Sequence, residues 1–183
     1  MTSQVETYAI VNGKDEQIHA SFSKKELHRD KLLHRGVHLF IEVFGGKFLL
    51  QKKANRPDIE NAGKWSSAVS GHVRFNESYE SAVLRESLEE LQLLINPAEM
   101  RHILKDFPTE KNGFEFVRLF SYLLDPKKEF PKISEEVDEI AIVPLAFLII
   151  DVHRHSDSYS PVFVDLFNKF LVLEKGLEDM HHV

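Results

Sequence analysis

The sequence has no cysteine among its 183 residues. A chain without thiols can form no disulfide framework, no cysteine-based zinc site and no thiol nucleophile, and disulfides give no support for secretion. Long apolar runs are missing as well, because the longest stretches, such as residues 143–152, fall far short of the roughly 18 to 20 residues that cross a bilayer. These absences exclude disulfide-stapled scaffolds and cysteine-dependent enzymes, and we expect no membrane span.

An excess of positive charge is also lacking. Lys and Arg number 23 against 29 Asp and Glu, which gives a formal net charge of -6, so we expect no non-specific attraction to nucleic acid. Any anionic ligand then requires local positive charge or a metal ion. The first six residues have neither a basic start nor an apolar run, so no signal or transit peptide is predicted and the cytoplasm is the expected location.

Length and periodicity predict a single domain over residues 1–183, because this length leaves little room for a second core. Alternating apolar residues and turn signals at Asn12-Gly13 and Gly45-Gly46 predict an N-terminal hairpin and further strands. The expected strands are 8–11, 17–20, 37–43, 48–51, 114–124 and 139–143. The expected helices are 24–33, 77–91, 145–152 and 161–177, with residues 53–71 as a long loop. Strands and helices interleave, so the predicted class is α/β (α+β), a mixed sheet between helices.

Three glutamates gather on one side of the predicted helix 77–91. At about 100° per residue, Glu86, Glu89 and Glu90 share an arc of roughly 100°. Like charges at this spacing destabilise a helix by about 0.2 to 0.5 kcal/mol per pair, whereas a hard cation such as Mg2+ favours carboxylate oxygens together with substrate phosphates. A solvated acidic face has the same pattern, so the triplet alone leaves both interpretations open.

The residues around the triplet extend the pattern over residues 71–93. The matching positions are Gly71, Glu77, Arg85, Glu86, Glu89, Glu90 and Leu93. They resemble the Nudix box, G-x5-E-x7-R-E-U-x-E-E-x-G-U, and the chain is identified as similar to the Nudix hydrolase superfamily. Ser87 stands where an aliphatic residue is usual and Gln92 where glycine is usual. A glycine there ends the helix in the left-handed conformation, which costs other residues about 1 to 2 kcal/mol, so Gln92 is expected to carry strain or to mark a shifted helix end.

The resemblance implies Mg2+ or Mn2+ as the cofactor. Its ligands would be the carboxylates of Glu86, Glu89 and Glu90, together with the backbone carbonyl of Gly71. The positions of Glu77 and Arg85 commonly form an ion pair that supports such a site. We favour Glu89 or Glu90 as the base that deprotonates a metal-polarised water. The alternative is a carboxylate of the later loop, at Glu135, Glu136 or Asp138.

Features upstream of the box narrow the resemblance. His28, His34-Arg35, Leu49 to Lys53, Trp65 and Ser70-Gly71-His72 look like the isopentenyl-diphosphate isomerase-like branch of the superfamily, over roughly residues 5 to 145. In true isomerases a cysteine precedes the Gly-His pair and glutamates follow on a later strand. Here the cysteine position is Ser70, a far weaker acid than a thiol of pKa about 8.5. Glu115 lies near one strand glutamate, but the other aligns with Val117.

Three histidines of this region, His28, His34 and His72, have two interpretations. They are either the remains of the isomerase metal site or ordinary loop and strand-end histidines, and the residues alone favour the second. Other candidate substrate contacts are the basic side chains and the single tryptophan. They are Lys52, Lys53, Arg56 and Arg74 for phosphate, Trp65 for stacking on a base or sugar, and Glu115.

The favoured function is a metal-dependent hydrolase that cleaves a diphosphate linkage in a nucleoside diphosphate-X or related small molecule. One alternative is a Nudix-fold module that binds a phosphorylated ligand without cleaving it, since Ser87 and Gln92 could tilt the carboxylates. Isopentenyl-diphosphate isomerase ranks below both. Selectivity would lie in loops 53–70 and 105–113. The apolar face of helix 161–177 is expected to pack in the core, with a homodimer surface as its alternative.

Overall fold

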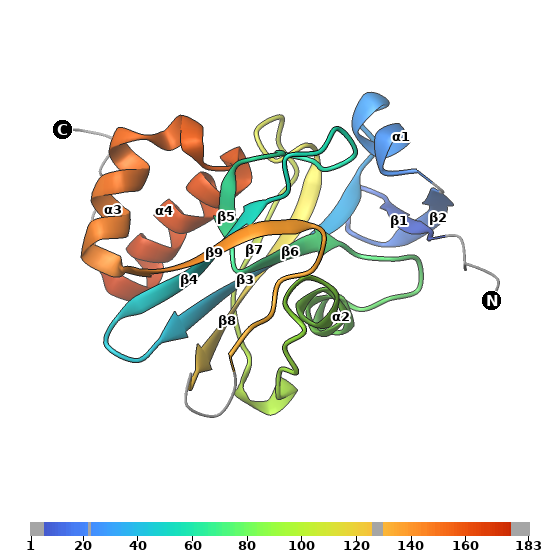
Figure 1. The fold of residues 1–183 in the computed structure, drawn as a ribbon. Coiled ribbons are helices and arrows are strands. Elements are labelled where there is room, and N and C mark those ends of the chain that lie inside the picture. The colour runs from blue at the N-terminus through green and yellow to red at the C-terminus, as the bar shows by residue number, and fades with distance from the viewer. Residues whose placement is uncertain (1–5, 22, 126–129, 177–183) are drawn as a thin grey trace.

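The computed structural model describes residues 6–21, 23–125 and 130–176. Within these residues nine strands join in one mixed sheet (Figure 1). The strands are β1 (Tyr8–Val11), β2 (Gln17–Ser21), β3 (His34–Val43), β4 (Lys47–Lys53), β5 (Trp65–Ser67), β6 (Val69–His72), β7 (Arg101–Asp106), β8 (Glu115–Leu124) and β9 (Val137–Pro144). The helices are α1 (Lys24–Arg29), α2 (Tyr79–Leu91), α3 (Leu145–Arg154) and α4 (Pro161–Lys175), with short 3-10 turns at Pro97–Glu99 and Ser156–Ser158.

Strand β3 organises the sheet because it has different partners along its length. It pairs in parallel with β8 from His34 opposite Glu115 to Val43 opposite Leu124. Its first half also pairs antiparallel with β6, and its last residues pair with β4. The register sets His34 beside Glu115, and it sets Gly36 beside His72. Residues far apart in the sequence therefore meet at the first half of β3.

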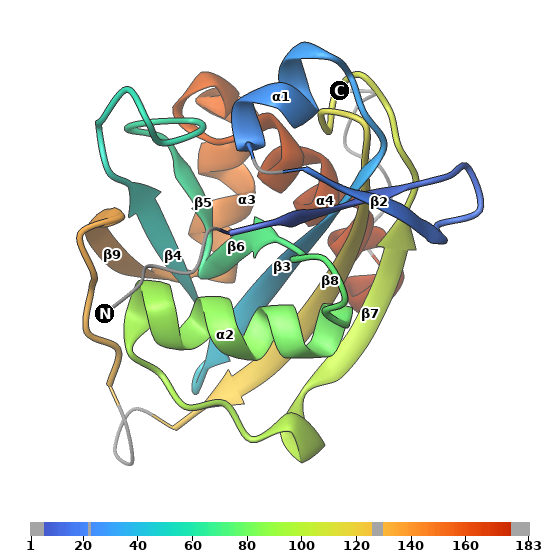
Figure 2. The same ribbon diagram turned by 90° about the vertical axis from the view of Figure 1, so that its right-hand side faces the viewer.

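Both faces of the sheet are buried under helices, as the apolar character of β3 on both faces predicts. Val37, Leu39 and Ile41 pack in one core with α2. Phe40 points to the opposite side and packs in a second core with α3 and α4. Figure 2 shows α2 in front of the sheet and the two C-terminal helices behind it. This arrangement confirms the predicted class, a mixed sheet between helices.

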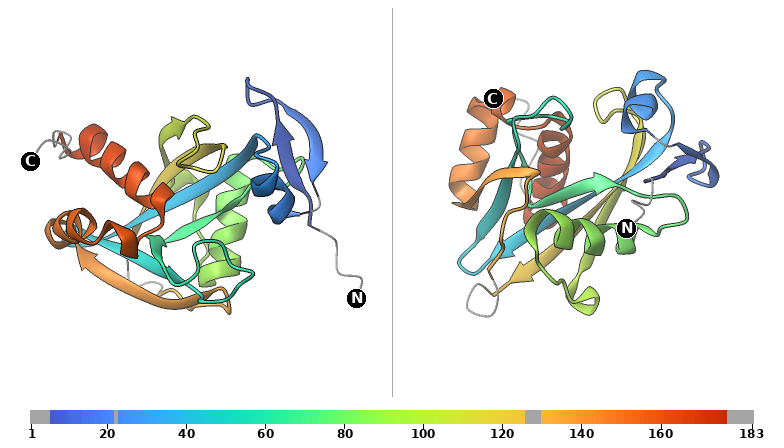
Figure 3. Two further views of the ribbon diagram at one scale, coloured as in Figure 1. Left: turned by 90° about the horizontal axis from the view of Figure 1, so that it is seen from above. Right: turned by 45° about the vertical axis from the view of Figure 1, so that its right-hand side comes forward.

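The N-terminal hairpin of β1 and β2 is confirmed, and it lies at the other end of the sheet from α3 and α4 (Figure 3). Ser23 caps α1 by accepting a hydrogen bond from the backbone N–H of Glu26. Helix α1 ends at Arg29, however, and does not continue to Leu33. The helix cannot continue because the backbone of Lys31 lies in the left-handed region, at φ 52°.

The C-terminal helices also follow the prediction. Helix α4 begins after Ser160, which accepts a hydrogen bond from the backbone N–H of Phe163, and it has Pro161 in its first turn. Its apolar face packs in the second core, through Phe163, Leu166, Phe167 and Phe170. The helix ends at Lys175, and the predicted end at residue 177 lies outside the described residues. No helix in the described part of the chain is long and apolar enough to cross a membrane.

The predicted long loop 53–71 is wrong in its second half. Residues 65–67 and 69–72 form β5 and β6, so only residues 54–64 are an irregular loop. Three or four residues are too few for an alternating pattern to be recognised, and pairing with β3 and β4 determines their structure. Strand β7 was also absent from the prediction, although Arg101–Asp106 pairs with β8.

Candidate active site

Helix α2 presents the acidic box, and its ends are well formed. Ser78 caps the start by accepting a hydrogen bond from the backbone N–H of Ser81 at 3.1 Å. Gln92 ends the helix in the left-handed conformation, with φ 50° and ψ 31°, as its place in the box predicts. Ser87 is fully buried, and its hydroxyl donates to the carbonyl of Val83 at 2.7 Å. Both departures from the Nudix pattern are therefore accommodated within the helix itself.

Arg85 holds the helix against the strand that carries Gly71. Its guanidinium donates two hydrogen bonds to the carboxylate of Glu77, at 2.8 and 2.9 Å, and a third to the carbonyl of His72 at 3.0 Å. The same side chain also donates to Glu86 at 2.6 Å and to Glu89 at 2.9 Å. Glu77 and Arg85 thus form the ion pair that the resemblance implies, and Arg85 links it to two box carboxylates.

Two glycines leave room for two carboxylates. A Cβ atom at Gly71 on β6 would overlap the carboxylate of Glu86, and one at Gly36 on β3 would overlap that of Glu115. Any side chain at either position would push the glutamate away, so close approach requires glycine. Burial, together with the negative charge of Glu90, raises the pKa of Glu86 to about 7. A bound cation would relieve this electrostatic cost.

Glu90 is the most deeply buried carboxylate of the box, with 2% of its surface exposed. Lys53 on β4 donates to its Oε1 at 2.5 Å. Gln51 and the backbone N–H of Ser70 both donate to its Oε2, each at 3.0 Å. Glu89 differs, because its side chain is 45% exposed and pairs with Arg74 as well as with Arg85.

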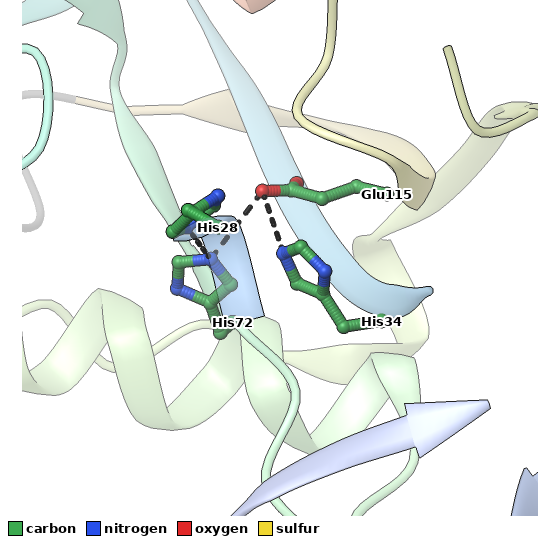
Figure 4. Close-up of side chains that lie close together, drawn as sticks. All are labelled: His28, His34, His72 and Glu115. Carbon is green, nitrogen blue, oxygen red and sulfur yellow. Dashed lines mark hydrogen bonds and ion pairs between the residues drawn. The ribbon is translucent and has the colours of Figure 1, made fainter. Parts of the chain in front are cut away.

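A second cluster lies beside the box, where His28, His34, His72 and Glu115 converge from α1, β3, β6 and β8 (Figure 4). One ligand atom of each lies within 4.8 Å of all the others. His28 Nε2 is 3.2 Å from His72 Nε2, and Glu115 Oε1 is 3.3 Å from Nε2 of both His34 and His72. Three imidazole nitrogens and one carboxylate oxygen are a donor set that first-row divalent metals accept.

The orientation of His34 shows that these residues fit a metal ion. Its Nδ1 lies 2.7 Å from the carbonyl of Leu32, so this nitrogen carries the hydrogen and Nε2 presents a lone pair in the neutral ring. That buried Nε2 has no hydrogen-bond partner among the described residues, although it faces Glu115. In the neutral ring this lone pair faces a carboxylate, and a cation bound between the two would relieve their repulsion. A backbone carbonyl behind a metal-binding histidine is also the usual support for the ligand.

The sequence favoured ordinary loop and strand-end histidines at His28, His34 and His72. His34 and His72 do lie at strand ends, and the structure brings both rings together with that of His28. The three rings lie 4.9 to 5.2 Å apart between centroids. They come from three different elements, so no spacing in the sequence indicates that they meet. Only the pattern shared with the isomerase-like branch could have identified them.

One cavity of about 780 Å3 joins the two clusters. Its lining includes Glu86 and Glu90 from the box, and His28, His72 and Glu115 from the histidine cluster. This volume lies within the range of small-molecule sites, about 300 to 1,000 Å3. The cavity can therefore receive one ligand that reaches both groups.

Positive charge also reaches this cavity. Lys53 lines it, as do Lys24 and Lys25 of α1, which the sequence analysis did not single out. Glu60, on the loop before β5, lies 3.2 Å from His28 Nε2. Its carboxylate raises the pKa of His28, against the opposing effect of burial. These residues were missed because only the folded loop and α1 bring them to the cavity.

The other predicted contacts lie elsewhere. Lys52 lies over the ring of Trp65, 5.8 Å from its centroid, and Arg56 pairs with Asp58 at 3.1 Å. Arg74 pairs with Glu6 and Glu89. The lining of the cavity does not include Lys52, Arg56, Trp65, Arg74 or Glu89. Of the later-loop carboxylates Glu135, Glu136 and Asp138, Glu136 lines it.

Comparisons with known proteins agree with the fold and with the box. Two curated relatives are similar to this chain over part of its length. An isopentenyl-diphosphate Delta-isomerase of Serratia proteamaculans is 36% identical over 86 residues, with 47% of each chain covered. An isopentenyl-diphosphate Delta-isomerase 2 of Photorhabdus laumondii is 34% identical over 86 residues, with 47% of this chain and 48% of that protein covered. The chain thus spans about half the length of the curated relatives it matches.

Among solved structures, a crystal structure from Deinococcus radiodurans matches with a TM-score of 0.76 at 19% identity, covering 90% of this chain and 98% of that one. A MutT protein from Methanosarcina mazei matches with a TM-score of 0.56 at 26% identity, covering 74% and 90% of the two chains. The family model described as the NUDIX domain matches residues 32–164. Together with the box on α2, this match shows that the chain belongs to the Nudix family.

Proposed function

We propose that this protein is a metal-dependent hydrolase that cleaves a diphosphate linkage in a nucleoside diphosphate-X or a related small molecule. The observation that carries the proposal is the shared cavity, in which Glu86 and Glu90 face the same space as Lys24, Lys25 and Lys53. Carboxylates hold a divalent cation and lysines contact phosphate oxygens. A diphosphate is a ligand that uses both kinds of group at once.

The residues of the box fit Mg2+ or Mn2+. Glu86 and Glu90, with the backbone carbonyl of Gly71, would hold the ion, which supplies charge neutralisation and a polarised water when it is bound. Glu89 points to the outer side of α2, where it pairs with Arg85 and Arg74. We therefore prefer Glu90 to Glu89 as the group that accepts the proton of the attacking water, because Glu90 lines the cavity.

The histidine cluster supports isopentenyl-diphosphate isomerase as a second candidate. Its donor set and the curated relatives point in this direction. Proton transfer at an allylic carbon needs an acid and a base of suitable pKa. The residues at the two expected positions are Ser70, whose hydroxyl is a weak acid, and the fully buried, apolar Val117. The isomerase therefore ranks below the hydrolase.

A module that binds without cleavage, which the sequence ranked above the isomerase, is now the third candidate. Its motivation was the pair of departures from the box, and the structure accommodates both of them. Ser87 satisfies its hydroxyl within the helix, and Gln92 ends the helix in the left-handed conformation that the usual glycine adopts. The space that Gly71 leaves for Glu86 is also kept, which a module freed from catalysis has little need to retain.

A single screen separates these functions. The purified protein is incubated with Mg2+ or Mn2+ and with nucleotide sugars, dinucleotides and prenyl diphosphates. A hydrolase releases phosphate or a monophosphate, and Glu90→Gln should abolish that release. Unchanged release from Glu90→Gln would show that the proposed site is wrong.

Two further outcomes identify the other candidates. Conversion of isopentenyl diphosphate to its dimethylallyl isomer, lost in Ser70→Ala, would put the isomerase first. Tight ligand binding in isothermal titration without turnover, independent of Mg2+, would put the binding module first.

We propose that the protein binds a small-molecule diphosphate, that it binds neither nucleic acid nor a membrane, and that it is located in the cytoplasm. The homodimer stays an alternative for the protein in solution. Size-exclusion chromatography with light scattering tests it, because a monomer of this chain has a mass of 21.2 kDa.

A further inference from the structure

The two carboxylate oxygens of Glu90 have different kinds of partner. Oε2 accepts hydrogen bonds from the side-chain amide of Gln51 and from the backbone N–H of Ser70, both neutral donors at 3.0 Å. Oε1 is 2.5 Å from the ammonium group of Lys53. The neutral donors thus fix the carboxylate in place, while the other oxygen is left for a cation.

The ammonium group of Lys53 lies among oxygen atoms. Besides Glu90 Oε1, it donates to the backbone carbonyl of Ser70 at 3.3 Å. A carboxylate oxygen and a neighbouring main-chain carbonyl are the kind of donors that Mg2+ takes. The lysine therefore occupies a position beside Glu90 that suits a metal ion.

Because both side chains of this pair are largely buried, leaving either charge without a partner is energetically costly. Glu90 is 2% exposed and the side chain of Lys53 is 13% exposed. An unpaired charge at such a depth is strongly destabilising, so the ionised carboxylate of Glu90 needs a cation beside it. Lys53 meets that need before any metal binds, and a divalent ion on Oε1 would make the ammonium group redundant and repel it.

We propose that Lys53 is the built-in counter-ion of Glu90. It neutralises the carboxylate in the metal-free protein, and its ammonium group moves away from Glu90 Oε1 when a divalent cation binds to the box. Its released ammonium group, which already lines the cavity, then contacts the phosphate of the substrate. The last step rests on the proposed hydrolase function, whereas the exchange at Glu90 does not require it.

The neighbouring lysine provides a matched control. Lys52 carries the same charge on the same strand but lies over the ring of Trp65 and not in the cavity lining. Mn2+ affinity is measured from the electron paramagnetic resonance signal of the free ion. We expect Lys53→Met to bind Mn2+ at least about tenfold more tightly than the wild type, and Lys52→Met to leave the affinity unchanged.

The same substitution made in Glu90→Gln protein separates a gain in Mn2+ affinity at Glu90 from Mn2+ binding to the histidine cluster. In Glu90→Gln protein the carboxylate charge is absent, so adding Lys53→Met should bring no gain in Mn2+ affinity. Unchanged or weaker Mn2+ binding by Lys53→Met in the presence of Glu90 would overturn the proposal. An equal gain in both backgrounds would also overturn it, because the competition would then not be for Glu90.

A measurement on the unmutated protein covers the case in which Lys53→Met does not fold. Lysines are reductively methylated with and without saturating Mg2+, and the modified residues are identified by mass spectrometry. Methylation of Lys53 should rise severalfold with Mg2+, while that of Lys52 stays constant. Equal methylation of Lys53 in the two states would contradict the exchange. Neither measurement uses hydrolysis, so a failed substrate screen and a failed exchange are distinct results.

Discussion

The acidic box and the histidine cluster share one cavity but balance their charges differently. The box carboxylates are paired with basic side chains of the protein, through Lys53 at Glu90 and Arg85 at Glu86 and Glu89. In the cluster, Glu115 faces the rings of His34 and His72, and burial lowers the pKa of His72. A metal ion must compete with protein cations at the box, whereas at the cluster it meets lone pairs. We therefore expect two classes of metal site, a tight one at the histidines and an exchangeable one on α2.

Removing a ligand from the histidine cluster should have the largest effect. Even a support behind a metal ligand is worth about 10- to 100-fold in metal affinity, so His34→Ala, which removes a ligand, should lower the affinity of the tight class by at least about 100-fold. Metal content after dialysis, measured by inductively coupled plasma mass spectrometry, reports the loss. The control is His102→Ala, since that ring contacts Phe120 and not the cluster. Full metal retention by His34→Ala would remove the distinction between the two classes.

Gly71→Ala should break the box without removing a carboxylate. The added methyl group overlaps Glu86, and a displacement of about 1 Å from the working geometry can cost roughly 100-fold in rate. The turnover number for the best substrate of the screen measures the effect. Gly13→Ala is the matched control, because a methyl group there has no heavy atom within 4 Å. Full activity in Gly71→Ala would mean that the position of Glu86 is not critical.

Glu77→Gln should loosen the support of the box by a smaller amount. The variant loses the charge that orients Arg85, so we expect hydrolysis to fall by about tenfold, with the carboxylates themselves intact. Arg85 holds the pKa of Glu77 below its usual value, although burial opposes this. The stabilisation from Glu77 is therefore complete at neutral pH and is lost as the pH falls through the lowered pKa. Between pH 7 and pH 3 the melting temperature of Glu77→Gln should fall less steeply than that of the wild type. Parallel plots of melting temperature against pH for the two proteins would contradict the role of the Glu77–Arg85 pair.

Gln92→Gly should have the smallest effect, on stability. Residue 92 is in the left-handed region at φ 50°, where glycine avoids a cost of about 1 kcal/mol. This gain corresponds to a rise in melting temperature of about 2 to 4 °C for a domain of this size. Asn61, also at positive φ, lies in the loop between β4 and β5 and not at a helix end, so Asn61→Gly tests whether any relief of strain acts equally. An unchanged melting temperature for Gln92→Gly would show that the helix end carries no strain.

The box was readable from the sequence because it is local. Helical spacing places Glu86 and Glu90 on one side of a helix, and the resemblance to the Nudix box adds Gly71. The hairpins and the caps at Ser23 and Ser160 were predictable for the same reason. Their signals depend on a few consecutive residues.

Spacing in the sequence did not predict the geometry of the cluster or of the counter-ion, because both depend on strand register. His34 faces Glu115 only through the parallel pairing of β3 with β8, and His72 joins them through β6, a strand too short to be recognised. Lys53 and Lys52 are adjacent and chemically identical, yet only one reaches Glu90. The pleat of β4 sends neighbouring side chains to opposite faces, and which face meets α2 is decided by the packing of the whole sheet.

The most direct test of the account is phosphorus NMR of the reaction in water enriched in 18O. We predict that, with Mg2+, the diphosphate resonances of the best substrate of the screen are replaced by those of two phosphorylated or phosphate products, one of which carries 18O. Glu90→Gln should leave the substrate resonances unchanged. A product that retains both phosphates without 18O, or a bound ligand that persists in the presence of Mg2+, would contradict hydrolysis at the box.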